Sequence, residues 1–412
     1  MRDRSDAAHP RVLYFTDTYP PQVNGVSVVT ELSVNGLRQR GWECMIVAPQ
    51  YPAIMPHGPL NRQRDPSVRS VPSAAFPPYP DIRLAAPLFG RCFEVVRRFQ
   101  PDVIHCATEF MIGRMGQVAA TRAGICRLSS YHTDFSRYTE AYGVPMLRGA
   151  VSRYIARFHR RSERVFTPSG PARDDLLRLG VASVEVWGRG VDTNAFSPGR
   201  RSNVLRASNE GDAVLFIHVG RLAAEKRVDV IVRAFNRART LLPAGAARLI
   251  IAGAGPHETA LRRMAGPDVL FLGVLDRARA LPRVYASADV FLFSSLTETL
   301  GLVVLEAMSS GLPVIATPAG GVADHLRHDE NGIAIGPHDI EAMADAIVSL
   351  TLDESRRRRL AAEARRTAMA LDWEAELDRL DNSYRSVLRA RSATPQRDNG
   401  VFASTGATSH GY

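Results

Sequence analysis

Two glutamates in the second half of the chain have a spacing that suits binding of a hydroxyl-rich ligand. Glu298 and Glu306 belong to the stretch SSLTETLGLVVLEAM, residues 294–308. An apolar run ends at Phe293 and a helix is expected to begin around Thr299–Gly301, so Glu298 precedes it and Glu306 lies about two turns inside. Carboxylates accept hydrogen bonds from neighbouring sugar hydroxyls. A helix cap followed by a solvated glutamate is the alternative interpretation.

The start of the same helix is suited to binding a phosphate group. The first N–H groups of a helix have no partner within it, and the positive end of the helix dipole lies there. Gly301 has no side chain to keep a ligand away from this backbone. We therefore expect a ligand that carries both phosphate and hydroxyl groups.

The only lysine in the chain belongs to a second candidate site. Of 52 basic side chains, 51 are arginine and one is Lys226. Arg221 and Lys226 follow an apolar run and precede a helical pattern, so both are expected to project from one loop. Two fixed cations there would neutralise a departing diphosphate. Solvated charges on a surface loop are the alternative.

Other motifs, by their absence, argue against several classes of ligand site. Gly253-Ala-Gly255-Pro has Glu258 where a G-x-G-x-x-G dinucleotide motif requires its third glycine. The chain contains no D-x-D, the usual ligand motif of metal-dependent transferases, so no metal site is expected and the two cations offer a substitute for a metal. It also contains no H-E-x-x-H and no G-x-S-x-G. Gly320-Gly321 either cradles a phosphate or forms a turn.

Short apolar runs alternate with helical patterns along the chain, which predicts βαβ units and parallel sheets buried on both faces. The helical patterns include Ser27–Arg40 and Arg227–Leu241. The expected strands are Val12–Phe15, Cys44–Val47, Val103–Cys106, Arg127–Tyr131, Val165–Thr167, Val214–Val219, Leu249–Ala252, Val269–Leu272, Val290–Phe293 and Val314–Ala316.

A length of 412 residues suits two domains, and the turn-rich segment 188–199 is the expected break. We predict an α/β protein with one doubly wound domain over residues 1–190 and another over 191–371. A helix over 372–390 is expected to return to the first domain, followed by a disordered tail over 391–412. Ligands of such sheets bind beyond the carboxyl ends of the strands, in the cleft between the domains.

Composition supports a folded protein with a basic first half. A hydrophobic fraction of 45% excludes wholesale disorder. Residues 1–190 hold +9 of the net charge of +10, which favours polyanions: nucleic acid, anionic membranes or phosphorylated substrates.

We expect a cytoplasmic protein that is soluble or peripheral to a membrane. The sequence has four cysteines without a metal-site or disulfide pattern, no signal-peptide pattern and no long apolar run. The cysteines are Cys44, Cys92, Cys106 and Cys126, and none forms a C-x-x-C pair.

Several motifs in the right order resemble the family 4 retaining glycosyltransferases of GT-B fold. They are GRLAAEKR at 220–227, IAGAGP at 251–256 and the 294–317 stretch. DTYPPQVNGVS at 17–27, PDVIH at 101–105 and YHTDFSRY at 131–138 resemble the subgroup with GDP-mannose-dependent α-mannosyltransferases and sulfoquinovosyl-diacylglycerol synthases. The resemblance implies two Rossmann-like domains, with the acceptor in the first and the nucleotide-sugar in the second.

The resemblance also implies roles in donor binding. Glu298 would contact hydroxyls of the donor sugar and Glu306 the ribose, while Arg221 and Lys226 would hold the diphosphate. The candidate donor-binding residues implied in this way are Gly25, Arg221, Lys226, Leu300, Gly301 and Glu306, with Leu300 and Gly301 acting through their backbone amides.

The first domain would contribute two further residues. His132 would reach the reacting carbon, so that His132 and Glu298 are the candidate catalytic residues. Gly25 would let the backbone approach the phosphates, although Asn24-Gly25 stands where many relatives have two glycines. A structural histidine at the end of a strand is the alternative for His132.

A basic amphipathic helix is expected over residues 151–164. Arg153, Arg157, Arg160 and Arg164 recur at helical spacing opposite Val151, Tyr154, Ile155 and Phe158. Such a helix either lies on an anionic membrane or packs with a solvated face. The segment Gln50–Arg69 is a second candidate for contact with an acceptor.

The resulting hypothesis is a metal-independent retaining glycosyltransferase with no cofactor and no nucleic-acid partner. Its expected donor is GDP-mannose and its acceptor a lipid or glycan, at the inner face of a membrane. A UDP-sugar-dependent glycolipid synthase is the first alternative. A non-catalytic nucleotide-sugar-binding protein and a phosphorylase with pyridoxal phosphate on Lys226 are alternatives of other classes.

Overall fold

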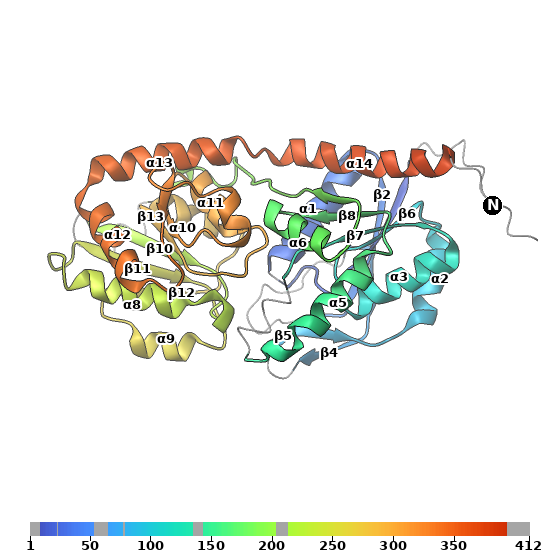
Figure 1. The fold of residues 1–412 in the computed structure, drawn as a ribbon, viewed down its shortest axis with the longest axis horizontal. Coiled ribbons are helices and arrows are strands. Elements are labelled where there is room, and N and C mark those ends of the chain that lie inside the picture. The colour runs from blue at the N-terminus through green and yellow to red at the C-terminus, as the bar shows by residue number, and fades with distance from the viewer. Residues whose placement is uncertain are drawn as a thin grey trace, which may run out of the picture.

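A computed structural model describes residues 9–22, 24–52, 65–76, 79–134, 143–202 and 213–393. Its strands form two parallel sheets covered by helices, in two lobes that lie side by side (Figure 1). Residues 53–64 of the segment Gln50–Arg69 and all of the tail beyond residue 393 lie outside the described residues.

The first lobe is built on a seven-stranded sheet in the order β3-β2-β1-β6-β7-β8-β9. All neighbouring strands in it are parallel, and the hairpin β4-β5 is antiparallel. The bounds are β1 Arg11–Phe15, β2 Glu43–Pro49, β3 Val68–Val71, β4 Ser73–Phe76, β5 Tyr79–Ala85, β6 Val103–Cys106, β7 Cys126–Ser130, β8 Arg164–Thr167 and β9 Val184–Val186.

Helices cover both faces of the first sheet, which is why its central strands are apolar throughout. Apolar side chains of α1 and α14 pack on one face, and those of α2 and α3 on the other. The helices of this lobe are α1 Gly25–Gln39, α2 Phe89–Phe99, α3 Met111–Ala123, α5 Arg148–His159, α6 Gly170–Arg178 and α14 Trp373–Ala393, with the short η2 at Pro145–Leu147.

The second lobe is built on a parallel six-stranded sheet in the order β12-β11-β10-β13-β14-β15. Its strands are β10 Val214–Val219, β11 Ala247–Ala252, β12 Val269–Gly273, β13 Val290–Phe293, β14 Val314–Ala316 and β15 Gly332–Ala334. Its helices are α8 Val228–Arg239, α9 Glu258–Met264, α10 Leu281–Ser287, α11 Leu302–Ser309, α12 Ile340–Leu352 and α13 Glu354–Met369, with η3 Pro198–Arg200, η4 Ala224–Lys226 and η5 Gly320–Asp324.

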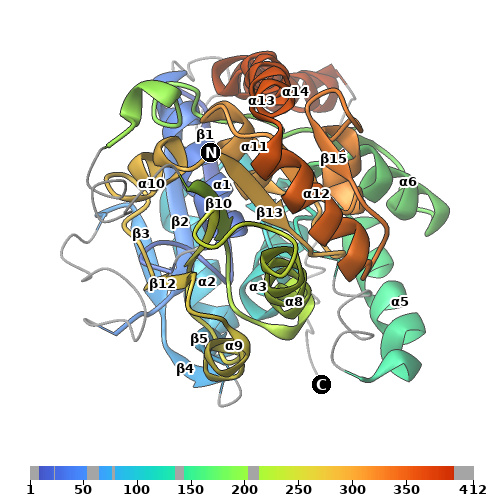
Figure 2. The ribbon, with the colours of Figure 1, turned by 90° about the vertical axis from the view of Figure 1, so that its left-hand side faces the viewer.

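The helices of the second lobe also divide between two faces of the sheet. Side chains of α8 and α12 pack on one face, and those of α10 and α11 on the other. Figures 1 and 2 agree that α8 and α9 lie far from α13, which continues into α14 along one edge of both lobes.

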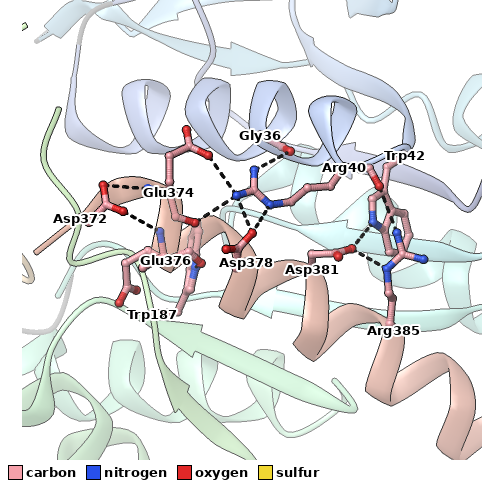
Figure 3. A network of polar contacts seen from close by, with 11 residues as sticks. Gly36, Arg40, Trp42, Trp187, Asp372, Glu374, Glu376, Asp378, Asp381 and Arg385 are labelled. Carbon is pink, nitrogen blue, oxygen red and sulfur yellow. Dashed lines mark hydrogen bonds and ion pairs between the residues drawn. The ribbon is translucent and has the colours of Figure 1, made fainter. Parts of the chain in front are cut away.

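The last helix, α14, is anchored to the first lobe by polar contacts that Figure 3 shows. The guanidinium of Arg40 donates to Glu374 at 3.0 Å and to Asp378 at 2.8 Å. The indole N–H of Trp42 donates to Asp381 at 2.6 Å. Because these partners recur along one face of α14, the helix is fixed along several of its turns.

Two expectations about elements are wrong in part. The basic helix expected over 151–164 is α5, Arg148–His159, and Arg164 instead begins β8 and pairs with Glu185 at 3.1 Å. Tyr154, expected on the apolar face, has an exposed side chain. Residues 391–393, expected in the tail, belong to α14, which continues to Ala393.

Candidate functional site

The loops that follow β10 and β13 bring together the two charges most strongly indicated by the sequence. These strands are neighbours in the sheet, so their carboxyl ends open at the same edge. Lys226, at the end of η4, forms an ion pair through Nζ with Oε1 of Glu298, with side chains 18% and 16% exposed. The hydroxyl of Ser294 donates to the carbonyl of Lys226 at 2.9 Å, which ties the two loops together.

Arg221 is held in the same loop by an acidic partner. Its guanidinium forms an ion pair with Oε1 of Glu225, whose side chain is fully buried. Arg221 itself remains about one-third exposed. Since a buried carboxylate requires a partner, this pair fixes the direction of Arg221.

Gly301 forms the turn into α11. The helix begins at Leu302, one residue beyond the expected start, and Gly301 is its N-cap with φ of 76°. A β-carbon at Gly301 would lie 2.9 Å from Cγ2 of Val322. Leu300 and Gly301 are both buried, so the access of a ligand to their backbone amides remains a prediction.

Two pairs of glycines shape the loops of this site. An added β-carbon at Gly320 would overlap the carbonyl oxygen of Glu298, and the N–H of Gly321 donates to that oxygen at 2.8 Å. An added β-carbon at Gly253 would overlap the carbonyl of Gly220. Close packing of backbone on backbone therefore accounts for these glycines.

Glu306 lies inside the second lobe and has two partners that the sequence does not indicate. Its side chain is 1% exposed and forms an ion pair through Oε1 with Arg277. The hydroxyl of Tyr285 donates to its other oxygen at 3.4 Å. Burial raises the pKa of Glu306, and the charge of Arg277 opposes that rise.

The first lobe meets this site through His132. The hydroxyl of Thr299 donates to the carbonyl oxygen of His132 across the two lobes. His132 as a whole residue is partly exposed, and burial of its imidazole, followed by the charge of His159, lowers its pKa to about 4. The imidazole is therefore neutral near pH 7.

Gly25 occupies an open position at the start of α1. The side chain of Asn24 caps the helix by accepting from the N–H of Ser27 at 2.9 Å. Gly25 is exposed, and an added β-carbon would have no atom within 4 Å. This helix start is thus accessible to a ligand without rearrangement of the described residues.

A second link between the lobes involves Asp324, at the end of η5. Its Oδ2 accepts from the N–H of Gly170 at 3.0 Å and pairs with Arg189 at 3.1 Å. Beside this link, a small cavity is lined by Ser169 and Asp175 of the first lobe and by Glu298 of the second. The structure thus places Glu298 at the boundary of the two lobes.

The structure brings Arg221, Lys226 and Glu298 into adjoining loops, whereas Glu306 is buried inside the second lobe beside Arg277. Sequence reasoning missed Arg277, Thr299 and Asp324. Arg277 follows β12, so its place after a strand was the one available signal. Among the described residues, no group of His, Cys, Asp and Glu is suited to hold a metal ion, and no helix is long and apolar enough to cross a membrane.

The two parallel sheets and the loops between them define a GT-B glycosyltransferase. The family model described as "Glycosyltransferase Family 4" matches residues 23–195, and "Glycosyl transferases group 1" matches residues 213–353. The chain belongs to glycosyltransferase family 4.

Individual relatives agree with this family. A GDP-mannose-dependent alpha-mannosyltransferase of Mycobacterium tuberculosis is 35% identical over 93% of this chain and 98% of its own length. The sulfoquinovosyl transferase SQD2 of Arabidopsis thaliana is 32% identical over 77% of this chain and 64% of its own length.

A solved structure agrees in fold. The Anabaena protein HepE in complex with UDP and glucose superimposes with a TM-score of 0.74, over 92% of this chain and 100% of its own length, at 18% identity.

Proposed function

We propose that this glycosyltransferase moves mannose from GDP-mannose to a lipid or glycan acceptor. The observation that supports a donor site is the ion pair of Lys226 with Glu298 beside the start of α11. In the proposal the ammonium binds phosphate and the carboxylate binds sugar hydroxyls. The choice of GDP-mannose rests on the mannosyltransferase relative with 35% identity.

Each candidate residue has a chemical task in this proposal. Arg221, Lys226 and the backbone amides of Leu300 and Gly301 stabilise the charge that develops on the departing diphosphate. Glu298 accepts hydrogen bonds from hydroxyls of the donor sugar.

Three further residues surround the donor. Glu306 binds the ribose. His132, as a neutral imidazole, lies near the reacting carbon, and Gly25 lets the start of α1 approach the phosphates.

The transfer is proposed to proceed with retention of configuration and without a metal ion. A bond forms between the acceptor oxygen and the anomeric carbon while the bond from that carbon to the phosphate oxygen breaks. The acceptor proton passes to the departing phosphate, so no separate general base is assigned. Arg221 and Lys226 supply the positive charge that a metal ion provides in other transferases.

A UDP-sugar donor with a diacylglycerol acceptor is the second candidate. It is supported by similarity to SQD2 and to an alpha-monoglucosyldiacylglycerol synthase of Streptococcus pneumoniae, which is 29% identical over 82% of this chain. HepE, solved in complex with UDP and glucose, is similar to this chain in fold alone, so its ligands do not argue for a UDP-sugar donor here.

A nucleotide panel tests the donor class. The melting temperature is measured with GDP, UDP and ADP and then with their sugars, because a ligand that binds the folded state alone raises it. We expect the largest rise with GDP and GDP-mannose. The largest rise with UDP would favour the glycolipid synthase, and no rise with any nucleotide would contradict the transferase site.

We further propose that the protein is cytoplasmic and associates peripherally with an anionic membrane, through a surface made of η2 and the exposed face of α5. Met146 is 80% exposed, and Leu147 is also exposed. Arg153 and Arg157 project from the adjoining turns of α5 and are exposed. Exposed apolar side chains beside arginines suit a negatively charged lipid surface.

Vesicle co-sedimentation tests the membrane proposal. We expect binding to vesicles with anionic lipid, little binding to neutral vesicles, and loss of binding in the double variant Arg153→Glu and Arg157→Glu. Arg178→Glu, on α6, is the matched control. Equal binding of wild type to both kinds of vesicle, or unchanged binding of the double variant, would contradict the proposal.

A further inference from the structure

Glu306 has a buried carboxylate that needs a positive partner to stay ionised. Its neighbours in α11, Leu305 and Ala307, are fully buried apolar residues. A carboxylate in such surroundings takes up a proton unless an opposite charge lies close by. Tyr285, its second partner, is itself buried, and burial together with the charge of Glu306 raises the pKa of its hydroxyl well above the usual value. Tyr285 is thus a neutral hydrogen-bond donor.

Arg277 supplies the missing charge from a well-defined loop after β12. Next to it, Asp276 organises the turn by accepting from the backbone N–H of Arg279 at 2.7 Å. The guanidinium of Arg277 lies 5.3 Å from the ring centre of Phe196, which is buried beneath it. Loop and ring together restrict the side chain to the orientation in which it reaches Glu306.

Arg277 also interacts with the first lobe. Burial raises the pKa of Glu31, on α1, and the charge of Arg277 is the influence that lowers it. The charge of Arg277 therefore acts on Glu31 of the first lobe, while its ion pair is with Glu306. The side chain of Arg277 is 30% exposed.

We propose that Arg277 is a positioning residue of the donor site, which keeps Glu306 ionised and oriented for the two ribose hydroxyls. This rests on the proposed function, in which Glu306 binds the ribose. A carboxylate can accept both hydroxyls of the diol, whereas a protonated carboxyl has one oxygen occupied by its own hydrogen. Arg277 makes this acceptor available at neutral pH.

The test compares nucleotide binding by wild type and Arg277→Met across pH. Isothermal titration with GDP, and with UDP if the panel favours uridine, runs between about pH 5.5 and 8.5. We expect wild-type affinity to change by less than about threefold, because Arg277 holds Glu306 ionised throughout. Arg277→Met should bind about tenfold more weakly at the acidic end and recover as rising pH removes the proton from Glu306.

Two controls separate this role from a structural one. The 2′,3′-dideoxy nucleotide lacks the ribose diol, so its affinity should be nearly the same for wild type and Arg277→Met. Arg279→Met, an exposed neighbour in the same loop, should behave as wild type. Arg277→Lys should restore most of the acidic-pH affinity, since it returns the charge.

The outcomes distinguish the two proposals. A pH-independent loss in Arg277→Met, equal for both nucleotides, would overturn the role of Arg277 while leaving the donor site in place. Failure of Arg277→Lys to restore binding would overturn it as well. Absence of nucleotide binding by wild type would overturn the proposed function itself.

Discussion

At Lys226 it can be tested directly whether a lysine, rather than an arginine, is required. Its ammonium forms a close ion pair with Glu298, and both side chains are largely buried. A planar guanidinium is larger than an ammonium and cannot occupy the same place. We expect Lys226→Arg to lower kcat/KM by at least about tenfold, measured as sugar transfer from the identified donor. Arg227→Lys, next in the loop, should retain normal turnover, and equal activity of both variants would mean that the lysine is not required.

Gly25 and Gly301 are predicted to respond differently to an added methyl group. Gly301→Ala places alanine at φ of 76° and its β-carbon 2.9 Å from Val322, so the free energy of unfolding should fall by about 1–2 kcal/mol. Gly25→Ala meets no neighbouring atom and should leave that free energy unchanged. It should raise KM for the donor if a phosphate approaches α1. Denaturant unfolding and steady-state kinetics measure the two effects, and an unchanged donor KM in Gly25→Ala would count against this role.

His132 should remain neutral over the whole physiological range. Burial and His159 lower its pKa to about 4, and protonation is therefore expected only as the pH falls toward that value. An unperturbed histidine titrates at about pH 6.5. The pH profile of kcat/KM should therefore show no inflection from His132 at about that pH. An inflection near pH 6.5 that disappears in His132→Gln would contradict this prediction.

At the scale of elements, the attachment of α14 depends on Arg40. Its side chain is mostly buried and bonds to Glu374 and Asp378 of that helix. Arg40→Met leaves both carboxylates without this partner, so we expect the free energy of unfolding to fall by about 1–2 kcal/mol. Arg389→Met, exposed on α14, should have little effect in the same urea denaturation experiment. Equal stability of both variants would mean that apolar packing alone holds α14.

The strands of both sheets could largely be predicted because those at the centre are short apolar runs. Val290–Phe293 and Val314–Ala316 have the expected bounds. In the two parallel sheets the edge strands β3, β9 and β15 were not predicted, because polar, charged or glycine residues interrupt their short apolar patterns, VRSV, VEV and GIA. The loops after β10 and β13 could be found from residue types that suit phosphate and sugar. Arg277 and Asp324 could not, because their partners lie far away in the sequence and become neighbours only through packing of the sheets.

At the scale of the whole molecule, three polar contacts join the lobes beside the candidate site: Thr299 to the carbonyl of His132, Asp324 to Gly170, and Asp324 to Arg189. Through Gly320 and Gly321, η5 also packs against the backbone of residues 298–300. A movement of the first lobe that displaces Asp324 would therefore also displace the loop that contains Glu298.

Asp324→Ala removes the acceptor for Gly170 and the partner of Arg189 at once. The pair is partly exposed, so the loss should be about 1 kcal/mol and should shift the lobes toward separation. We expect a larger radius of gyration in small-angle scattering and a decrease in kcat/KM of about fivefold. Asp329→Ala is the matched control, because its partners Arg356 and Arg359 belong to its own lobe. If Asp324→Ala and Asp329→Ala gave the same scattering and turnover, the contact at α6 would have no part in holding the lobes together.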